Sequence, residues 1–384
     1  MNNNMSDNNG KHKKTKAPRE FDFERYHERH VAFLLTYLGH EYSGIAYQPD
    51  NPNTVEHVLF EALQKIKLCR FEGGCPVGFS RCGRTDRGVS AFGNVIAMHV
   101  RSNLTRERDG VEFVRIGKGS AEAPDEAEER AEMDYVHLIN RVLPPTVRLR
   151  AWSPVPREFS ARFSCDARTY RYYFPITDGL DLARMRQASS DLLGDHDFRN
   201  FCKMDGSISN FVRTIHNFEI SAVGGMGCAT IRGNAFLYHQ VRCMMAVLFM
   251  VGHRDEDPSI IRRLLDIAAV HSKPPYELAD DHNLCLWQCD FPPTAGLQWR
   301  YSDTTSLAAT LRGLVQPAMV KATLLQSMYD DVLAQGGETH PPTSRRKLHI
   351  PLLERPPEMD LEGVMGRKAR RADAKQKRTA LCTD

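Results

Sequence analysis

The sequence predicts an α+β fold with a mixed or antiparallel central sheet flanked by helices. The 384 residues are 41% apolar and 26% charged, which is close to ordinary globular usage. Segments with strand periodicity and segments with helix periodicity follow one another without strict alternation, and this order favours α+β over a parallel α/β fold. The length suggests two or three domains.

The first strand and helix are expected near the N-terminus of this core. Residues 31–37 are an apolar, β-rich run that is typical of a buried strand. Thr54 can cap a helix over residues 55–68, where apolar side chains recur at helical spacing and form one buried face. Three further elements are expected in this half: a strand at 95–100, a helix at 135–143 that ends before a proline pair, and a strand at 147–151.

The second half of the core repeats this mixture. Residues 169–175 predict a strand with Tyr170, Tyr172 and Phe174 on one face. The apolar segment 237–252 predicts a long buried helix. The remaining expected elements are helices at 182–192, 259–269 and 319–333, and strands at 213–223, 229–234 and 284–291.

These elements suggest four regions. Residues 1–28 are polar and basic, and we expect a disordered tail. Residues 29–150 form a first subdomain with a surface insertion at about 102–133, and residues 151–300 form a second subdomain. Residues 301–384 form a C-terminal extension with a helix and a basic tail.

Composition limits the classes of protein. The net charge is only +3, so a nucleic-acid surface would have to come from local clusters such as residues 11–16 and 367–378, which by default are solvated tails. The ten cysteines form no C-x-x-C pair, which argues against zinc and for reduced thiols. The longest apolar stretch, 243–251, is too short for a membrane span, and no signal peptide is evident. We expect a soluble protein of the nucleus or cytoplasm, neither secreted nor membrane-bound, with no metal.

The most informative segment is GRTDRGVSA at residues 83–91. Glycines at both ends allow a tight turn and a close approach to a ligand. Arg84 and Arg87 flank Asp86 and should hold its carboxylate ionised. A positioned, ionised aspartate can act as a nucleophile or a base. A bare Arg-x-Asp-Arg-Gly turn would more often be a surface ion pair, but the full string is much rarer.

This string resembles the active-site loop of the TruA family of tRNA pseudouridine synthases. Other strings resemble the family in the same order: YLGHEYSG at 37–44, FSARFSCDARTYRY at 159–172, NAFLYHQVR at 234–242 and LCLWQCDF at 284–291. The similarity covers about residues 31–292. DFRNFCKMD at 197–205 and PLLERP at 351–356 look most like the eukaryotic branch that modifies positions 38 and 39 of tRNA.

The resemblance implies a pseudouridine synthase fold with two subdomains around an active-site cleft. It implies that Asp86 is the nucleophile, that Tyr170 stacks on the target base or removes a proton from it, and that Arg242 pairs with Asp86. It also implies that Arg84 and Arg87 bind substrate, with Arg84 filling the gap that the flipped base leaves. The implied partners are tRNA and a second copy of the chain. The implied reaction is an isomerisation that needs no cofactor and no metal.

The residues alone leave simpler readings open. Tyr170 could be an ordinary strand tyrosine, Arg242 could form a structural salt bridge with another acid, and Arg84 could serve only to fix the loop. His239 is expected to be a satisfied core histidine.

Three other functions compete with the proposed one. The first is a tRNA-binding protein of this fold that has lost catalysis. The second is a hydrolase that uses Asp86, although no second carboxylate or metal cluster accompanies the loop in the sequence. The third is a synthase that acts on another tRNA position or another RNA.

Overall fold

The computed structural model describes residues 21–104, 131–206, 208–336, 349–358, 363 and 365. Its centre is a ten-stranded sheet in which β5 and β11 are parallel and the other paired neighbours are antiparallel. The predicted α+β class with a mixed sheet is therefore confirmed. The strand order is β12 (Arg300–Tyr301), β6 (Val147–Pro154), β1 (His27–Tyr37), β5 (Ser90–Ser102), β11 (Leu284–Asp290), β7 (Ala167–Pro175), β10 (Met226–Gly233), β9 (Val212–Val223) and β8 (Gly194–Asp197), and β4 (Ser80–Arg81) pairs with β5. A separate short hairpin joins β2 (Phe71–Glu72) to β3 (Cys75–Pro76).

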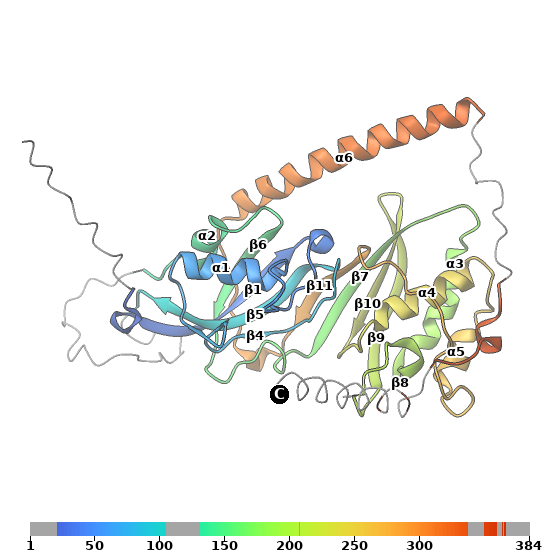
Figure 1. Cartoon of the computed structure of the whole chain (residues 1–384), viewed down its shortest axis with the longest axis horizontal. Helices are drawn as coiled ribbons and strands as arrows, with labels where there is room; N and C mark the ends of the chain where they lie inside the picture. The colour runs from blue at the N-terminus through green and yellow to red at the C-terminus, as the bar shows by residue number, and fades with distance from the viewer. Residues whose placement is uncertain are drawn as a thin grey trace, which may run out of the picture.

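Helices cover each half of the sheet (Figure 1). The helices are α1 (Val55–Lys65), α2 (Tyr135–Asn140), α3 (Leu182–Ser189), α4 (Gln240–Gly252), α5 (Ile260–Leu265) and α6 (Thr304–Ala334). Helices α1 and α2 share one apolar core with β1, β5 and β6, whereas α3, α4 and α5 share another with β7, β9 and β10. Thr54 caps α1 as expected, accepting a hydrogen bond from the backbone N–H of His57 at 3.2 Å.

The two halves meet where β11 lies between β5 and β7. Leu286 of β11 is paired with Ala91 of β5 on one side and with Tyr170 of β7 on the other. Since Asp86 lies five residues before Ala91, this register brings the aspartate loop and the Tyr170 strand to the same part of the sheet. The centre of the sheet thus positions the candidate site.

Regular structure begins before residue 29, within the segment that we expected to be disordered. Residues Phe23–Arg25 form a short 3-10 helix, and β1 begins at His27. The rings of Phe21 and Tyr26 stack with their centroids 5.3 Å apart, and the guanidinium of Arg101 lies 5.2 Å from the Phe21 ring centroid. These contacts stabilise residues 21–28, where disorder was expected. Residues 1–20 lie outside the described residues.

Other expectations differ in length. Helix α6 begins fifteen residues before the expected start at 319 and continues through Pro317, although proline normally interrupts a helix. Helix α5 ends at Leu265, four residues before the expected end. Strands β2, β3, β4 and β12 have only two residues each, too short for a periodic pattern to predict. Most of the insertion expected at 102–133, and the basic segment 367–378, lie outside the described residues. Within the described part of the chain, no helix combines the length and apolarity needed to cross a membrane.

Candidate active site

The loop that carries Asp86 is held by the first strand and the residues that follow it. The hydroxyl of Tyr37 lies 2.6 Å from Thr85 Oγ1, and the N–H of Ile45 donates to the Thr85 carbonyl oxygen at 3.2 Å. Buried Asn94 bonds both backbone groups of Gly83, accepting from its N–H at 3.0 Å and donating to its carbonyl oxygen at 2.9 Å. These hydrogen bonds fix the backbone before Asp86, and a fixed backbone limits the positions that the carboxylate can take.

The two glycines of the loop have different roles. Gly88 has a φ of +78°, a left-handed conformation that favours glycine. Gly83 does not adopt this conformation, but a Cβ atom there would collide with Leu286 Cδ2. The expected need for special backbone angles is confirmed at Gly88, whereas Gly83 is required for close packing against β11.

The predicted site residues meet at a cavity of about 530 Å³. Its wall includes Asp86, Arg84, Tyr170 and Arg242, which come from the loop, from β7 and from α4. An adjoining cavity of about 360 Å³ shares Arg84, Asp86 and Arg242 and adds Arg87. The structure therefore brings together residues that lie up to 158 positions apart in the chain. A volume of this size is in the range of small-molecule sites.

Burial controls the charge of Asp86 more than the sequence suggested. Its side chain is 30% exposed. Burial raises its pKa to about 6, while Arg242, and then Arg84, act in the opposite direction. Arg84 thus favours the ionised carboxylate as predicted, but the sequence did not show that burial opposes it or that Arg242 is the stronger cation. A pKa near 6 still leaves most of the carboxylate ionised at neutral pH, and it is well placed for a group that must react there.

Arg242 forms a different ion pair from the predicted one. Its Nη1 lies 3.5 Å from Oδ2 of Asp281, and its Nε donates to the Ala279 carbonyl oxygen at 2.7 Å. The segment before β11 explains this difference, because the Asp281 carboxylate packs against Gly88 of the aspartate loop. Arg242 therefore acts on Asp86 through its charge, beside a second carboxylate that sequence reasoning did not identify.

His239 lies closer to Asp86 than expected for a core histidine. Its Nε2 is 3.5 Å from Asp86 Oδ2, and its buried Nδ1 has no hydrogen-bond partner among the described residues. Burial, Arg242 and Lys203 lower the pKa of His239 to about 4, so the ring is neutral at neutral pH and the contact is not an ion pair. The prediction of a satisfied core histidine is wrong, and the left-handed backbone of His239 at φ +64° places its ring beside the aspartate.

Tyr170 lies between the two cores and on the cavity wall. Its ring meets Phe236 edge to face, with centroids 4.9 Å apart and planes at 81°. Burial raises the pKa of its phenol well above the usual value, so the hydroxyl stays protonated at neutral pH. This favours the stacking role over proton removal. Tyr172, by contrast, is a core residue with 1% exposure.

Arg84 and Arg87 are both exposed at the rim of the cleft. Arg84 lines both cavities and Arg87 only the outer one. Their guanidinium groups can reach an anionic ligand that enters the cleft, because exposed arginines can bind phosphate without losing internal partners. These positions fit the predicted substrate-binding role, which stays a prediction.

A carboxylate with a pKa near 6, on the wall of a cavity that also has arginine and aromatic side chains, has the chemistry that a nucleophile or a base requires. Comparison with known proteins gives the family. A family model described as tRNA pseudouridine synthase matches residues 188–292. The chain is 45% identical to the human tRNA pseudouridine(38/39) synthase over 74% of this chain and 60% of that protein.

For two further relatives, the region similar to this chain makes up a larger share of the relative's length. The mouse tRNA pseudouridine(38/39) synthase is 41% identical over 88% of this chain and 72% of that protein. The Caenorhabditis elegans protein named probable tRNA pseudouridine synthase tag-124 is 37% identical over 78% of this chain and 76% of that protein. The chain belongs to the TruA family of tRNA pseudouridine synthases. It spans about 60% of the length of the human and bovine relatives.

Proposed function

We propose that this chain converts uridine into pseudouridine at positions 38 and 39 of tRNA, with Asp86 as the nucleophile. The observation that carries the proposal is the convergence of Asp86, Tyr170 and Arg242 on one cavity. The names of the human, bovine, mouse and yeast relatives support the choice of positions.

The site suits the bond changes of this reaction. The glycosidic bond breaks, the uracil turns, and a carbon–carbon bond forms in its place. Atoms and electrons balance within the nucleotide, so the reaction itself consumes no redox cofactor and no energy source. The Asp86 carboxylate bonds to the base or to the sugar as the C1′–N1 bond breaks, and it is released when the C1′–C5 bond forms. C5 loses one proton in this exchange and N1 gains one. Arg242 and Arg84 keep the carboxylate charged, and His239 stays neutral beside it.

The target base must leave its stack to reach Asp86. Flipping a base out of the stack costs a few kcal/mol of free energy, and stacking on an aromatic side chain can offset about 1–3 kcal/mol of that cost. The edge-to-face contact with Phe236 holds the Tyr170 ring at the cavity wall, and this supports the stacking role. The exposure of Arg84 and Arg87 supports a role in binding the RNA, with Arg84 filling the gap that the flipped base leaves.

Two substitutions at Tyr170 distinguish a role in stacking on the target base from a role in proton removal. Tyr170→Ala should lower kcat/KM by about 5- to 150-fold, which corresponds to 1–3 kcal/mol of lost stacking. Tyr170→Phe keeps the ring and should stay within about threefold of the parent, because only the hydroxyl is lost. The measurement is the single-turnover rate of each of the two variants on a tRNA transcript, as a function of enzyme concentration. A loss in Tyr170→Phe as large as that in Tyr170→Ala would show that the hydroxyl takes part in proton transfer.

The proposed activity is tested with purified protein and an unmodified tRNA transcript, without added cofactor. The expected result is pseudouridine in the product, detected by carbodiimide labelling and primer extension. The Asp86→Asn protein, assayed at equal concentration and with its tRNA affinity measured, is the control. Tight tRNA binding with no pseudouridine in the parent would favour the inactive-binder alternative.

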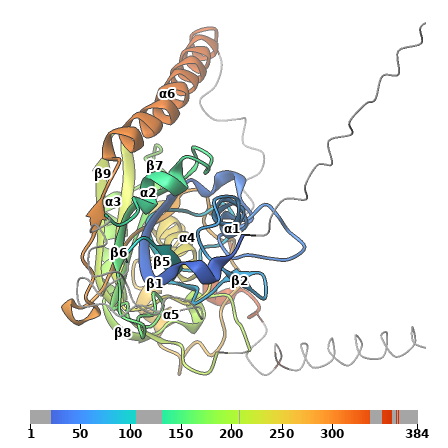
Figure 2. The same ribbon diagram turned by 90° about the vertical axis from the view of Figure 1, so that its left-hand side faces the viewer.

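We also propose that the active form is a homodimer. Helix α6 supports this because none of its residues is buried, although many are apolar. Figures 1 and 2 show α6 projecting along one side of the body. Exposed apolar patches of this kind commonly mark protein interfaces. The patch consists of Val320, Leu324, Leu325, Met328, Tyr329 and Val332, each at least 47% exposed.

A charge placed in this patch should separate the subunits. Leu324→Glu is expected to convert a dimer into a monomer in light-scattering chromatography, because an interface cannot readily bury an unpaired carboxylate. Gln326→Glu adds the same charge two residues away on the helix and should leave the dimer intact. A parent protein that is monomeric at micromolar concentration would contradict the dimer proposal.

For its location we propose the nucleus, the cytoplasm or both. The nine described cysteines are all free thiols, as is usual in reducing compartments.

A further inference from the structure

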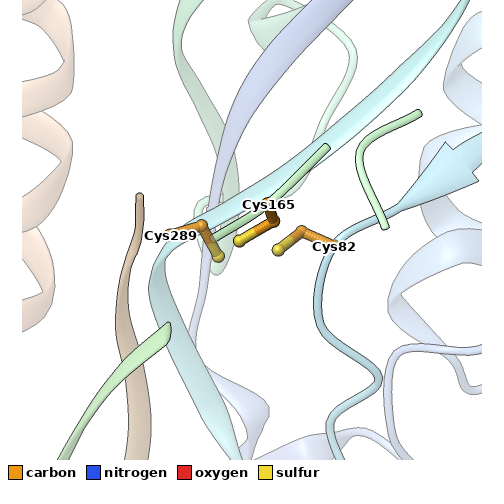
Figure 3. A group of neighbouring side chains, drawn as sticks. All are labelled: Cys82, Cys165 and Cys289. Carbon is orange, nitrogen blue, oxygen red and sulfur yellow. The ribbon is translucent and has the colours of Figure 1, made fainter. Parts of the chain in front are cut away.

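The fold brings together three cysteines that no sequence spacing connects. Cys82 lies just after β4, Cys165 lies just before β7, and Cys289 lies on β11. Their three sulfur atoms all lie within 4.8 Å of one another. Figure 3 shows the three side chains pointing toward a common centre.

The cluster is well shielded from solvent. Cys82 and Cys165 are 6% and 9% exposed, and Cys289 is half-buried. The surrounding side chains are mainly apolar and include Val95, Phe159 and Ala161. Burial argues against a redox sensor, because sensor thiols are accessible to their oxidants. Convergence of three cysteine sulfurs, two of them on buried residues, is instead the geometry of a soft-metal site.

One cation lies beside the sulfurs and can balance their charge. The Nη1 of Arg168 donates to the Cys165 carbonyl oxygen at 3.3 Å. Arg168 follows Cys165 by three residues and lies in β7, so its guanidinium group is next to the segment that carries Cys165. Since buried charges need compensation, Arg168 makes an anionic metal–thiolate group acceptable in this core.

We propose that Cys82, Cys165 and Cys289 form a three-thiolate site for a soft d10 metal cation. Thiolates select Cu⁺ and Zn²⁺ over harder ions. Sulfur atoms at about 2.3 Å from a central ion lie roughly 4 Å apart in a planar trio, so small side-chain rotations close the site. Structural Zn²⁺ normally takes four ligands. Within the described ranges no fourth His, Cys, Asp or Glu atom joins the three sulfurs, and this favours Cu⁺.

The site would link three segments that build the active site. Cys82 is four residues before Asp86, and Cys165 is five residues before Tyr170. Cys289 is on the strand between those two segments in the sheet. A bound ion would therefore hold these three segments together and stabilise the wall of the cavity. The metal proposal does not depend on the proposed reaction.

The test titrates the metal-free, reduced 384-residue chain with Cu⁺ under anaerobic conditions in competition with a chelating dye, and separately with Zn²⁺. The expected result is one equivalent of Cu⁺ per chain and a higher Tm with Cu⁺ than without it. Cys165→Ser and Cys289→Ser should each weaken binding at least about 100-fold. Cys82 is left unchanged because it adjoins the aspartate loop. Cys285→Ser, on the same strand as Cys289, is the matched control and should bind like the parent.

X-ray absorption of the metal-loaded parent gives a readout that needs no variant. Three sulfur neighbours and no lighter ligand are expected for Cu⁺. One equivalent of Zn²⁺ that is lost in Cys165→Ser and Cys289→Ser would support the same site with zinc as its ion. No bound ion in the folded parent, ligation by nitrogen or oxygen alone, or equal binding in Cys285→Ser and both cluster variants would overturn the proposal.

Discussion

Asp86→Asn should abolish pseudouridine formation, with a loss on the order of 10⁴-fold or more in the single-turnover rate, because an amide cannot replace a carboxylate nucleophile. The shape of the side chain is kept, so the cavity and the rim arginines should still bind tRNA. The measurement is a single-turnover assay with binding determined separately. Turnover within tenfold of the parent would exclude Asp86 as the nucleophile.

The same substitution should stabilise the fold at neutral pH, and this separates lost chemistry from lost structure. The folded pKa of Asp86 is about 6, whereas the unfolded value is about 3.9. Because the folded pKa is the higher one, ionising Asp86 costs folding free energy as the pH rises from about 4 to about 6. Removing that cost should raise the free energy of unfolding at pH 8 by about 1–3 kcal/mol. Denaturant unfolding checks this, and a clear destabilisation would show that burial does not disfavour the charge.

Arg242→Met should shift the pH dependence of activity upward. Activity in the parent should rise with pH through about 6, as Asp86 loses its proton. Arg242 is the strongest charge that lowers this pKa, so its removal should move the midpoint to higher pH and reduce kcat/KM near pH 6 on the order of 100-fold.

Arg242→Lys is the matched control, because it keeps the positive charge but not the planar donor group. Its midpoint should stay close to that of the parent even if its plateau falls. Equal midpoints in Arg242→Met and the parent would show that the role of Arg242 is structural, through its contacts with Asp281 and Ala279.

The elements that the sequence predicted well are those with long periodic patterns. The strand of residues 31–37, the helix after Thr54 and the buried helix α4 all occur where apolar spacing placed them. The two-residue strands carry too few side chains for any period. The extended α6 was shortened in the prediction, since propensity alone does not show that a helix can pass through Pro317.

The sequence also identified the main residues on the cavity wall, because Asp86, Tyr170 and Arg242 each lie within a distinctive string. It did not predict the pairing of Arg242 with Asp281, which depends on how the segment before β11 packs on Gly88. The sequence led us to expect His239 in the core, because the surrounding residues do not show that its backbone is left-handed. Tertiary packing alone assembles the cysteine cluster, so cysteine spacing along the chain could not reveal it.

The most direct test of the central claim maps pseudouridine at single-nucleotide resolution on four anticodon-arm tRNA transcripts. One carries uridine at positions 38 and 39, two carry it at only one of them, and the fourth carries cytidine at both. The account predicts product at each uridine offered at these positions, none with the double-cytidine transcript, and none with Asp86→Asn. Product at other positions with equal yield from the double-cytidine transcript, or product formed by Asp86→Asn, would contradict it.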